Sequence, residues 1–388
     1  MAKRFTIVVL FALLVWSNVA AQQATAPATT SKLLEVTVPA PSLKGNLLGD
    51  PTEQKIYVYL PPSYASSVKR YPTLYLLHGF LGNSSSWTSG AYQGMNLQTL
   101  MDELIKAGKV REMILVAANG FNAYGGSFYT NSPVTGNWDD FITKDLVTNI
   151  DTTYRTIAKA ESRGIAGHSM GGYGAVTLGT NHPDIFNALY ALSPCCLVMD
   201  SDMSEANPAW SKVLTVTSRD QIKTKPQSLD DFFNSVFYAL AAAFSPNPTR
   251  APFFVDLPVQ AKVHRLVDEP WDVYRSRVDE ACPPGSTVPC VEKVEAAYNK
   301  WREHIPVYML DKNKDNLLKL HGIFLDYGEK EQFAHIRTGV QLLSQGLAQR
   351  GIPHQFEVYP EGDHGSRIRV RMETRVIEFF NEKLVFEK

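Results

Sequence analysis

Several features that define other protein classes are scarce in this chain. Its 38 Lys and Arg residues are balanced by 39 Asp and Glu residues, so the formal charge is −1 and the sequence pI is near 6.8. Binding to nucleic acid or to an acidic membrane surface usually requires an excess of basic residues. The spacing of Cys and His matches no zinc site. We therefore expect no nucleic acid, no metal and no acidic membrane surface as a partner.

Long apolar runs are also lacking. The run over residues 5–16 is too short to span a membrane, which takes about 20 apolar residues, and no later run reaches that length. Basic residues precede this run and a Val-Ala-Ala stretch follows it, which predicts a secretory signal peptide over residues 1–21. The protein is then secreted or periplasmic, with an uncleaved anchor as the alternative. Residues 22–31, rich in Ala, Thr and Gln, are expected to form a disordered tether.

Cysteine is scarce as well, with 4 residues in the whole chain. An exported protein can form disulfides. Cys282 and Cys290 bracket a short Pro-rich and Gly-containing loop, and we predict that they are bonded to each other. Cys195 and Cys196 are adjacent, and a disulfide between neighbours is strained. We expect these two cysteines to be packed or free thiols.

Most of the chain alternates between short apolar runs and helical patterns. Residues 33–38 and 55–60 are predicted as early antiparallel strands, and Asp139 or Asp140 is expected to cap a helix with a stripe of Phe141, Leu146, Ile150 and Tyr154. Further strands are predicted at residues 74–77, 113–117, 162–166, 188–192, 322–327 and 355–359, and further helices at 97–106, 336–349 and 371–384. Strands that alternate with helices predict an α/β fold, in which helices cover both faces of a mostly parallel sheet. Arg367, Arg369 and Arg371 are expected to lie in solvent at the start of the last helix.

The pattern changes between residues 197 and 320. A helix that begins at Ser228 has an aromatic side with Phe232, Phe233 and Phe237, and residues 271–281 and 291–304 also have helical spacing. We predict that residues 32–196 and 321–388 form the core. Residues 197–320 then form a largely helical cap or lid, inserted after the sixth strand.

The stretch with the clearest chemical meaning is Gly167-His168-Ser169-Met170-Gly171. It has the pattern G-x-S-x-G between a predicted strand and a predicted helix, which is the context of a nucleophile elbow. Glycines two residues before and two after the serine let the strand and the helix pass close together. The pattern predicts Ser169 as the nucleophile, at the edge of the sheet where α/β folds bind ligands; the alternative is a chance match in a loop.

A serine nucleophile needs a base, and the base needs an acid that orients it. His364 follows the last strand in a loop that contains Gly362 and Gly365, so we predict it as the base. Glu331, in the turn after the preceding strand, is the predicted acid, with Asp326 and Glu329 as alternatives. Asp363 ranks last because neighbouring loop residues rarely turn their side chains toward each other.

The oxyanion of an acyl-transfer reaction is stabilised by two backbone amides. One is expected from Met170, directly after the nucleophile. The other is expected from the loop His78-Gly79-Phe80-Leu81, with the Phe80 amide as the first choice and the Leu81 amide as the second.

Four segments together resemble one family. They are His78-Gly79 with Trp87, the segment Ser127 to Pro133 with Trp138-Asp139-Asp140-Phe141, the elbow, and Gly328-x-x-Glu331-x-Phe333. They are similar to the esterase D-like "putative esterase" family of α/β hydrolases, which includes S-formylglutathione hydrolases, feruloyl and acetyl-xylan esterases and mycolyltransferases. The resemblance covers residues 33–195 and 322 to the C-terminus but not the insertion. Most members carry Asp where this chain has Glu331, although the mycolyltransferases resemble it in using a glutamate.

The resemblance implies an α/β-hydrolase fold and ester hydrolysis through an acyl-enzyme, without a metal or an organic cofactor. Because a signal peptide argues against the cytosolic formylglutathione reaction, we expect a secreted or periplasmic serine carboxylesterase. Its substrate would be an acylated or feruloylated carbohydrate or another small-molecule ester. The alternatives are an acyltransferase that moves the acyl group to a sugar or lipid alcohol, and a hydrolase-fold protein that binds without catalysis. Phe80, Trp87, Tyr129 and Tyr173 are predicted to line the acyl pocket, with ordinary core packing as the alternative.

Overall fold

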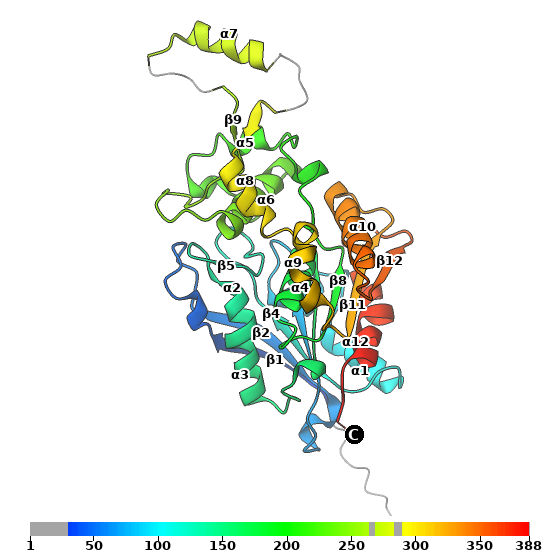
Figure 1. Ribbon diagram of the computed structural model, residues 1–388. Coiled ribbons are helices and arrows are strands. Elements are labelled where there is room, and N and C mark those ends of the chain that lie inside the picture. Colours follow the sequence, from blue (N-terminus) through cyan, green and yellow to red (C-terminus); the bar gives the residue numbers. More distant parts are fainter. Residues whose placement is uncertain (1–29, 264–267, 283–288, 388) are drawn as a thin grey trace, which may run out of the picture.

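The computed structural model describes residues 30–263, 268–282 and 289–387 (Figure 1). The predicted signal peptide and residues 22–29 of the predicted tether lie outside the described residues. Among the described helices, none is both long enough and apolar enough to cross a membrane.

The core contains an eight-stranded sheet with the strand order β1-β2-β4-β3-β7-β8-β11-β12. Strand β2 runs antiparallel to both of its neighbours, and every other neighbouring pair is parallel. The α/β class and the early antiparallel pair are therefore confirmed. The strands are β1 (Lys32–Pro39), β2 (Glu53–Leu60), β3 (Thr73–Leu77), β4 (Ile114–Ala118), β7 (Arg163–His168), β8 (Ala188–Leu192), β11 (Gly322–Gly328) and β12 (Gln355–Tyr359).

Successive side chains on the central strands enter two different buried clusters. On β3, Tyr75 and Leu77 belong to one cluster, while Leu74 and Leu76 belong to the other. This follows from the period of two in a strand, which sends alternate side chains to opposite faces of the sheet. Helices α3 (Val147–Thr153), α4 (Met170–Asn181) and α10 (Ala334–Gln349) pack in the first cluster, and α1 (Leu97–Lys106) and α12 (Ile377–Lys383) pack in the second. Helices thus cover both faces, as predicted.

Two local expectations about the core were wrong. The helix that begins with α2 (Trp138–Asp140) and continues through a π-helical segment (Phe141–Leu146) into α3 has Asn137 at its N-cap, so Asp139 and Asp140 lie inside the first turn. At the other end of the chain, α11 (Ile368–Arg371) is followed by a π-helical segment (Met372–Val376) and then α12. Arg371 is not in solvent: it is buried and pairs with Asp326 and Glu357.

The segment between β8 and β11 adds no strand to the eight-stranded sheet. Most of it lies at one end of the molecule, while its last helix lies beside α4 (Figure 1). It is largely helical, as predicted. Its helix α6 (Leu229–Phe244) is capped by Ser228, whose side chain accepts a hydrogen bond from the Asp231 amide at 3.1 Å. The other elements are α5 (Trp210–Val213), β9 (Val259–Ala261), α7 (Trp271–Ala281), β10 (Val291–Lys293), α8 (Glu295–Arg302), α9 (Leu310–Leu317) and three single 3-10 turns at Ser201–Met203, Arg219–Gln221 and Pro306–Met309.

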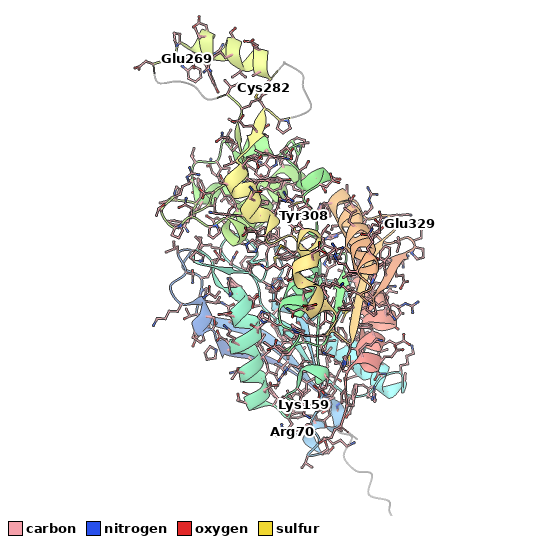
Figure 2. The ribbon with its side chains drawn as sticks, in the orientation of Figure 1. Arg70, Lys159, Glu269, Cys282, Tyr308 and Glu329 are labelled. Carbon is pink, nitrogen blue, oxygen red and sulfur yellow. A yellow bond between two sulfur atoms is a disulfide. The ribbon has the colours of Figure 1, made fainter. Side chains whose placement is uncertain are left out.

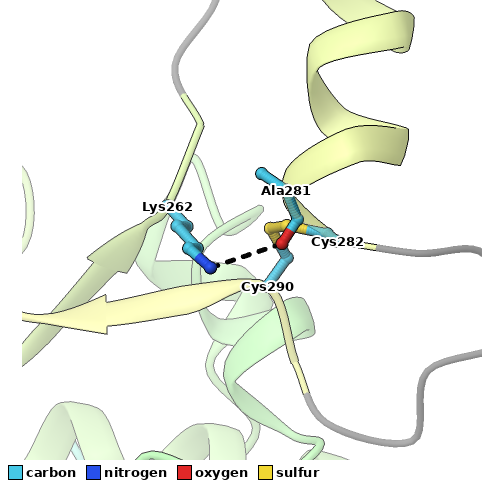
Figure 3. The surroundings of a disulfide bond; sticks show 4 residues. All are labelled: Lys262, Ala281, Cys282 and Cys290. Carbon is cyan, nitrogen blue, oxygen red and sulfur yellow. Dashed lines mark hydrogen bonds between the residues drawn. A yellow bond between two sulfur atoms is a disulfide. The ribbon is translucent and has the colours of Figure 1, made fainter.

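Helix α7 stands away from the rest of the insertion on the β9–β10 pair (Figure 1). Cys282 and Cys290 form the predicted disulfide at its base, with their Cα atoms 5.5 Å apart (Figure 3). The Lys262 ammonium also donates to the Ala281 carbonyl at 3.3 Å there. The expectation of a helix over residues 291–304 was wrong for the first residues of this range. Val291 begins strand β10 instead, because a β-branched residue beside β9 gains an antiparallel partner.

Candidate active site

Ser169 lies at a sharp turn between β7 and α4. Its φ of 57° and ψ of −116° belong to a sparsely populated region of backbone conformation, as a nucleophile elbow requires. A Cβ atom at Gly171 would overlap the Leu77 carbonyl, and one at Gly167 would overlap the backbone of Gly171. The Ser169 amide donates to the Leu192 carbonyl at 3.0 Å, which fixes the turn against β8. The pattern G-x-S-x-G is therefore a structural requirement of this crossing and not a chance match in a loop.

The loop after β3 is held rigidly beside the elbow. The ring of His78 accepts a hydrogen bond at Nε2 from the Gly120 amide, at 2.8 Å, so its Nδ1 carries the proton and donates to the Gly79 carbonyl, also at 2.8 Å. Burial lowers the pKa of His78 to about 4, which keeps this ring neutral. The Leu81 amide donates to the Gly125 carbonyl at 2.9 Å and is therefore occupied. Within the described residues the Phe80 and Met170 amides donate to no protein group, which leaves both available to an oxyanion.

His364 and Glu331 meet at the ends of β12 and β11. The His364 Nδ1 lies 2.9 Å from the Glu331 Oε2, and the Glu331 carboxylate is fully buried. The other carboxylate oxygen of Glu331 accepts from the Phe333 amide at 3.1 Å. Because a carboxylate can only accept, Nδ1 carries the proton and Nε2 of His364 is free to act as a base.

The two loops that carry this pair cross in close contact. A Cβ atom at Gly328 would overlap the backbone of Gly362, and the Lys330 amide donates to the Gly362 carbonyl at 2.7 Å. This crossing brings residues 33 positions apart in sequence within hydrogen-bonding distance. Glycine at position 328 is thus the local feature that lets Glu331 reach His364.

The alternative acids are placed elsewhere. Asp326 lies within β11, where it accepts hydrogen bonds from Tyr190 at 2.7 Å and from Arg371 at 2.8 Å. Glu329 is exposed at the edge of the molecule (Figure 2). Asp363 is also exposed and accepts from the amides of its own loop, at Gly365 and Ser366. Of the four carboxylates, Glu331 is the one hydrogen-bonded to His364.

His168, beside the nucleophile, holds the backbone of the His364 loop. Its Nε2 lies 2.6 Å from the His364 carbonyl and therefore donates to it. Burial, with a smaller contribution from the neighbouring His364, lowers the pKa of His168 to about 3, so this ring is neutral. The two imidazole rings are 4.6 Å apart between centroids. The two residues are 196 positions apart, so no local pattern in the sequence indicates this contact.

Ser169 borders two spaces with different walls. One is an apolar cavity of about 30 Å³, whose lining includes Phe128, Phe233, Cys196 and His335, all buried. The other is a cleft of about 520 Å³ lined by Gly79, Asn83, Ser85, Tyr92 and other residues that follow β3, of which Asn83 is exposed. His364, Phe80, Phe232 and Phe333 border both spaces. The nucleophile thus lies between a small buried pocket and a large open one.

The aromatic residues predicted to line the acyl pocket are placed differently, except for Phe80. Trp87 is fully buried under the Tyr92 ring, at 4.8 Å between centroids. Tyr129 donates its hydroxyl to the His78 carbonyl, and Tyr173 donates its hydroxyl to the His304 carbonyl. Both tyrosines border a separate cavity of about 310 Å³ that does not include Ser169 among its lining residues. Ordinary core packing, the alternative, describes these three residues.

Several residues at the site carry no recognisable signal in the sequence. Tyr92 accepts from the Gly79 amide at 2.8 Å and lines the open cleft. Phe232 packs against Phe80 and Phe333, with ring centroids 5.8 and 5.7 Å apart. Cys195 and Cys196 are free thiols, as predicted, but both also line the small cavity. In the described residues, no three His, Cys, Asp or Glu side chains are grouped as metal ligands.

Comparisons with known proteins agree with this geometry. Residues 51–368 match the family model described as "Putative esterase". The chain is 33% identical over 142 residues to an endo-1,4-beta-xylanase/feruloyl esterase of Xylanibacter ruminicola. The matched residues make up 34% of this chain and 18% of that protein. It is 34% identical over 126 residues to an esterase of Mycobacterium tuberculosis. These residues make up 31% of this chain and 25% of that protein. The chain thus spans a quarter or less of these relatives' length.

Solved structures show the same fold at lower identity. A ferulic acid esterase has a TM-score of 0.57 at 20% identity, with 92% of this chain and 100% of that one covered. An S-formylglutathione hydrolase of Staphylococcus aureus has a TM-score of 0.51 at 16% identity, with 90% and 99% covered. The likeness extends through the sheet and confirms the predicted α/β-hydrolase fold.

Proposed function

Since the chain belongs to the "putative esterase" family, we propose that it is a serine carboxylesterase that hydrolyses an acyl or feruloyl-type ester through an acyl-enzyme intermediate. The observation that carries this proposal is the hydrogen bond of 2.9 Å between Glu331 and His364, because His364 borders the same two spaces as Ser169. A strained serine, an oriented imidazole and two unoccupied amides are the parts that acyl transfer requires.

The reaction follows from the positions of these groups. Ser169 attacks the ester carbonyl while His364 Nε2 takes its hydroxyl proton, and Glu331 stabilises the imidazolium that forms. The Phe80 and Met170 amides stabilise the oxyanion. When the intermediate collapses, His364 returns the proton to the leaving alcohol and the acyl group stays on Ser169. Water then attacks with His364 as the base, which releases the carboxylic acid and restores the serine.

The substrate and the location are proposed on separate grounds. The basic, apolar and small residues at the N-terminus support export, and hence a secreted or periplasmic enzyme. The curated relative from Xylanibacter ruminicola is named as a xylanase and feruloyl esterase. The open cleft of about 520 Å³ gives room for a carbohydrate alcohol beside Ser169. We therefore place acylated or feruloylated carbohydrate first among the candidate substrates.

Labelling with a fluorophosphonate tests the nucleophile directly. Intact mass should show one adduct per chain, and none for Ser169→Ala, while Ser344→Ala on helix α10 should label like the wild type. The Ser169→Ala protein should lose on the order of 10⁴-fold or more in kcat on p-nitrophenyl esters. Turnover of methyl ferulate and of an acyl-chain series then describes the substrate. A folded protein that takes no label would favour a hydrolase-fold protein that binds without catalysis.

An acyltransferase remains the second candidate because aromatic side chains border Ser169. Phe80, Phe232 and Phe333 line both spaces, and the Phe333 ring lies 4.9 Å from the His364 ring. These rings limit the access of water to Ser169. An alcohol acceptor in the open cleft could therefore compete with water for the acyl-enzyme. Product analysis with increasing glycerol or sugar distinguishes the two reactions. Hydrolysis alone at every acceptor concentration would remove this candidate.

A further inference from the structure

A polar side chain at the small cavity beside Ser169 has one atom that no described residue satisfies. His335 borders this cavity and is 4% exposed. Its Nε2 is buried and has no hydrogen-bond partner among the described residues. Because buried polar side-chain atoms are generally paired, this nitrogen is available to pair with a ligand group.

The orientation of His335 is fixed by a residue of the insertion. Oδ1 of Asp202 lies 2.7 Å from the His335 Nδ1 and also accepts from the His335 amide at 2.8 Å. Burial alone would raise the pKa of Asp202, but hydrogen bonding and charge interaction with His335 outweigh it, and the net shift is downward. An ionised Asp202 only accepts, so Nδ1 carries a proton and faces Asp202. Asp202 does not border this cavity, so Nε2, the ring nitrogen that Asp202 leaves unused, is the one left for a ligand there.

The remaining walls of this cavity give Nε2 no competing partner. They consist of the rings of Phe80, Phe128, Phe232, Phe233 and Phe333, the aliphatic or sulfur-containing side chains of Val236, Ile336, Met203, Cys195 and Cys196, and the catalytic pair Ser169 and His364. An apolar pocket distinguishes ligands by size only weakly. A pocket with one buried hydrogen-bonding atom rejects much more strongly a ligand that leaves this atom unpaired.

We propose that His335 is a specificity-determining residue that pairs, through Nε2, with a hydroxyl group on the acyl part of the substrate. The proposal rests on the esterase function proposed above. A hydroxyl suits this position because it can donate to the neutral imidazole or accept from the protonated one. The acyl part suits the smaller, apolar cavity, since it stays on Ser169 while the alcohol departs. The open cleft, with exposed residues such as Asn83 on its rim, suits the departing alcohol.

Matched ester pairs test the proposal. The ratio of kcat/KM would be measured for ethyl 3-hydroxybutanoate over ethyl butanoate, and for methyl 4-hydroxycinnamate over methyl cinnamate. In each pair the leaving alcohol is the same, so the ratio reports the acyl hydroxyl alone. The wild type should prefer the hydroxylated ester of at least one pair by about tenfold. His335→Phe should bring this ratio to about one, and His335→Gln, which keeps a hydrogen-bonding group, should restore part of it.

Three controls separate this inference from the function on which it rests. The amount of active enzyme cancels in the ratio, so a loss of folded protein does not change it. Fluorophosphonate titration checks that each variant still contains a reactive Ser169. His321→Phe alters an exposed histidine away from the cavity and should keep the wild-type ratio. Absence of labelling in the wild type would contradict the esterase function itself.

Two results would overturn the inference while the function stands. One is a labelled, active wild type with no preference in either acyl pair, or a preference that His335→Phe leaves intact. The other is a His335-dependent preference found only when the hydroxyl is moved to the alcohol, as in 2-hydroxyethyl against propyl butanoate.

Discussion

The core and the insertion both border the two spaces at Ser169, and they do so by different means. The core supplies Ser169, Glu331 and His364 from the ends of β7, β11 and β12, where close backbone crossings fix each position. The insertion supplies Phe232, Phe233 and Asp202. The two rings reach the core through contacts of 5.7 to 6.3 Å between ring centroids, and Asp202 reaches it through its carboxylate. Backbone crossings tolerate no added atom, whereas ring contacts tolerate repacking.

This difference suggests a division of roles. The reacting groups need positions accurate to a fraction of an ångström, which rigid strand ends provide. Residues that select the acyl group need only the right shape and one correctly placed polar atom. We therefore expect substitutions in the core wall to change kcat by orders of magnitude, and substitutions in the insertion wall to change substrate preference by smaller factors.

The largest effect is expected from Glu331→Gln. The amide keeps the size of the buried side chain but cannot stabilise the imidazolium of His364, so kcat should fall by about 10³- to 10⁴-fold. Steady-state rates on p-nitrophenyl butyrate and the melting temperature check this, and the fold should be retained. Glu329→Gln, two residues away and exposed, is the matched control. Wild-type kcat in Glu331→Gln would remove Glu331 from the proposed triad.

A smaller effect is expected from Phe232→Ala in the insertion wall. This half-buried ring borders both spaces at Ser169, so its removal joins them. We expect kcat/KM on short esters to fall about tenfold and the preferred acyl chain to lengthen, because the enlarged pocket holds a short chain less well. A p-nitrophenyl ester series from acetate to decanoate measures the profile. Phe356→Ala, at an exposed position on β12, should leave it unchanged. An unshifted profile in Phe232→Ala would mean that the insertion does not select the acyl group.

The parts of the site that could be predicted from the sequence are those whose geometry is local. The elbow of Ser169 requires glycines at fixed offsets, and the turn after β11 requires Gly328. The positions of these glycines in the sequence therefore indicate the local backbone structure. The sheet could be predicted because its central strands are continuous apolar runs. The pairing of Glu331 with His364 was predicted from the order of the strands that carry them, and the structure shows the hydrogen bond.

The parts that could not be predicted depend on contacts between distant residues. Asp202 and His335 are 133 positions apart and belong to the insertion and the core, and neither has a local pattern that names its partner. Nearness in sequence was also misleading for Tyr173, four residues after Ser169. Its ring is buried and borders the separate cavity of about 310 Å³ instead. Arg371 likewise turns inward because it pairs with Asp326 and Glu357. The group of three arginines to which it belongs in the sequence does not indicate these partners.

Asp326 is, besides Glu331, the other buried carboxylate of the core. Because it is not hydrogen-bonded to His364, Asp326→Asn should change kcat little. Burial raises the pKa of Asp326 to about 6, since the single charge of Arg371 is shared with Glu357. A carboxyl with a raised pKa binds its proton more tightly in the folded state. Stability from this group is therefore present below about pH 4 and is lost as pH rises toward 6. Melting temperatures from pH 4 to 7 should fall in the wild type relative to Asp326→Asn. A loss of kcat as large as that in Glu331→Gln would instead make Asp326 the catalytic acid.

The smallest effect is expected from the part of the insertion that projects from the molecule. Helix α7 stands apart on the β9–β10 pair, and the Cys282–Cys290 disulfide lies at its base (Figures 1 and 3). None of its residues borders either space at Ser169. The double substitution Cys282→Ser with Cys290→Ser should therefore leave kcat/KM on p-nitrophenyl butyrate within roughly twofold of the wild type. A change in the acyl-chain profile of this variant, similar to that of Phe232→Ala, would show that the arm is coupled to α6, and the insertion would then act as one unit in substrate selection.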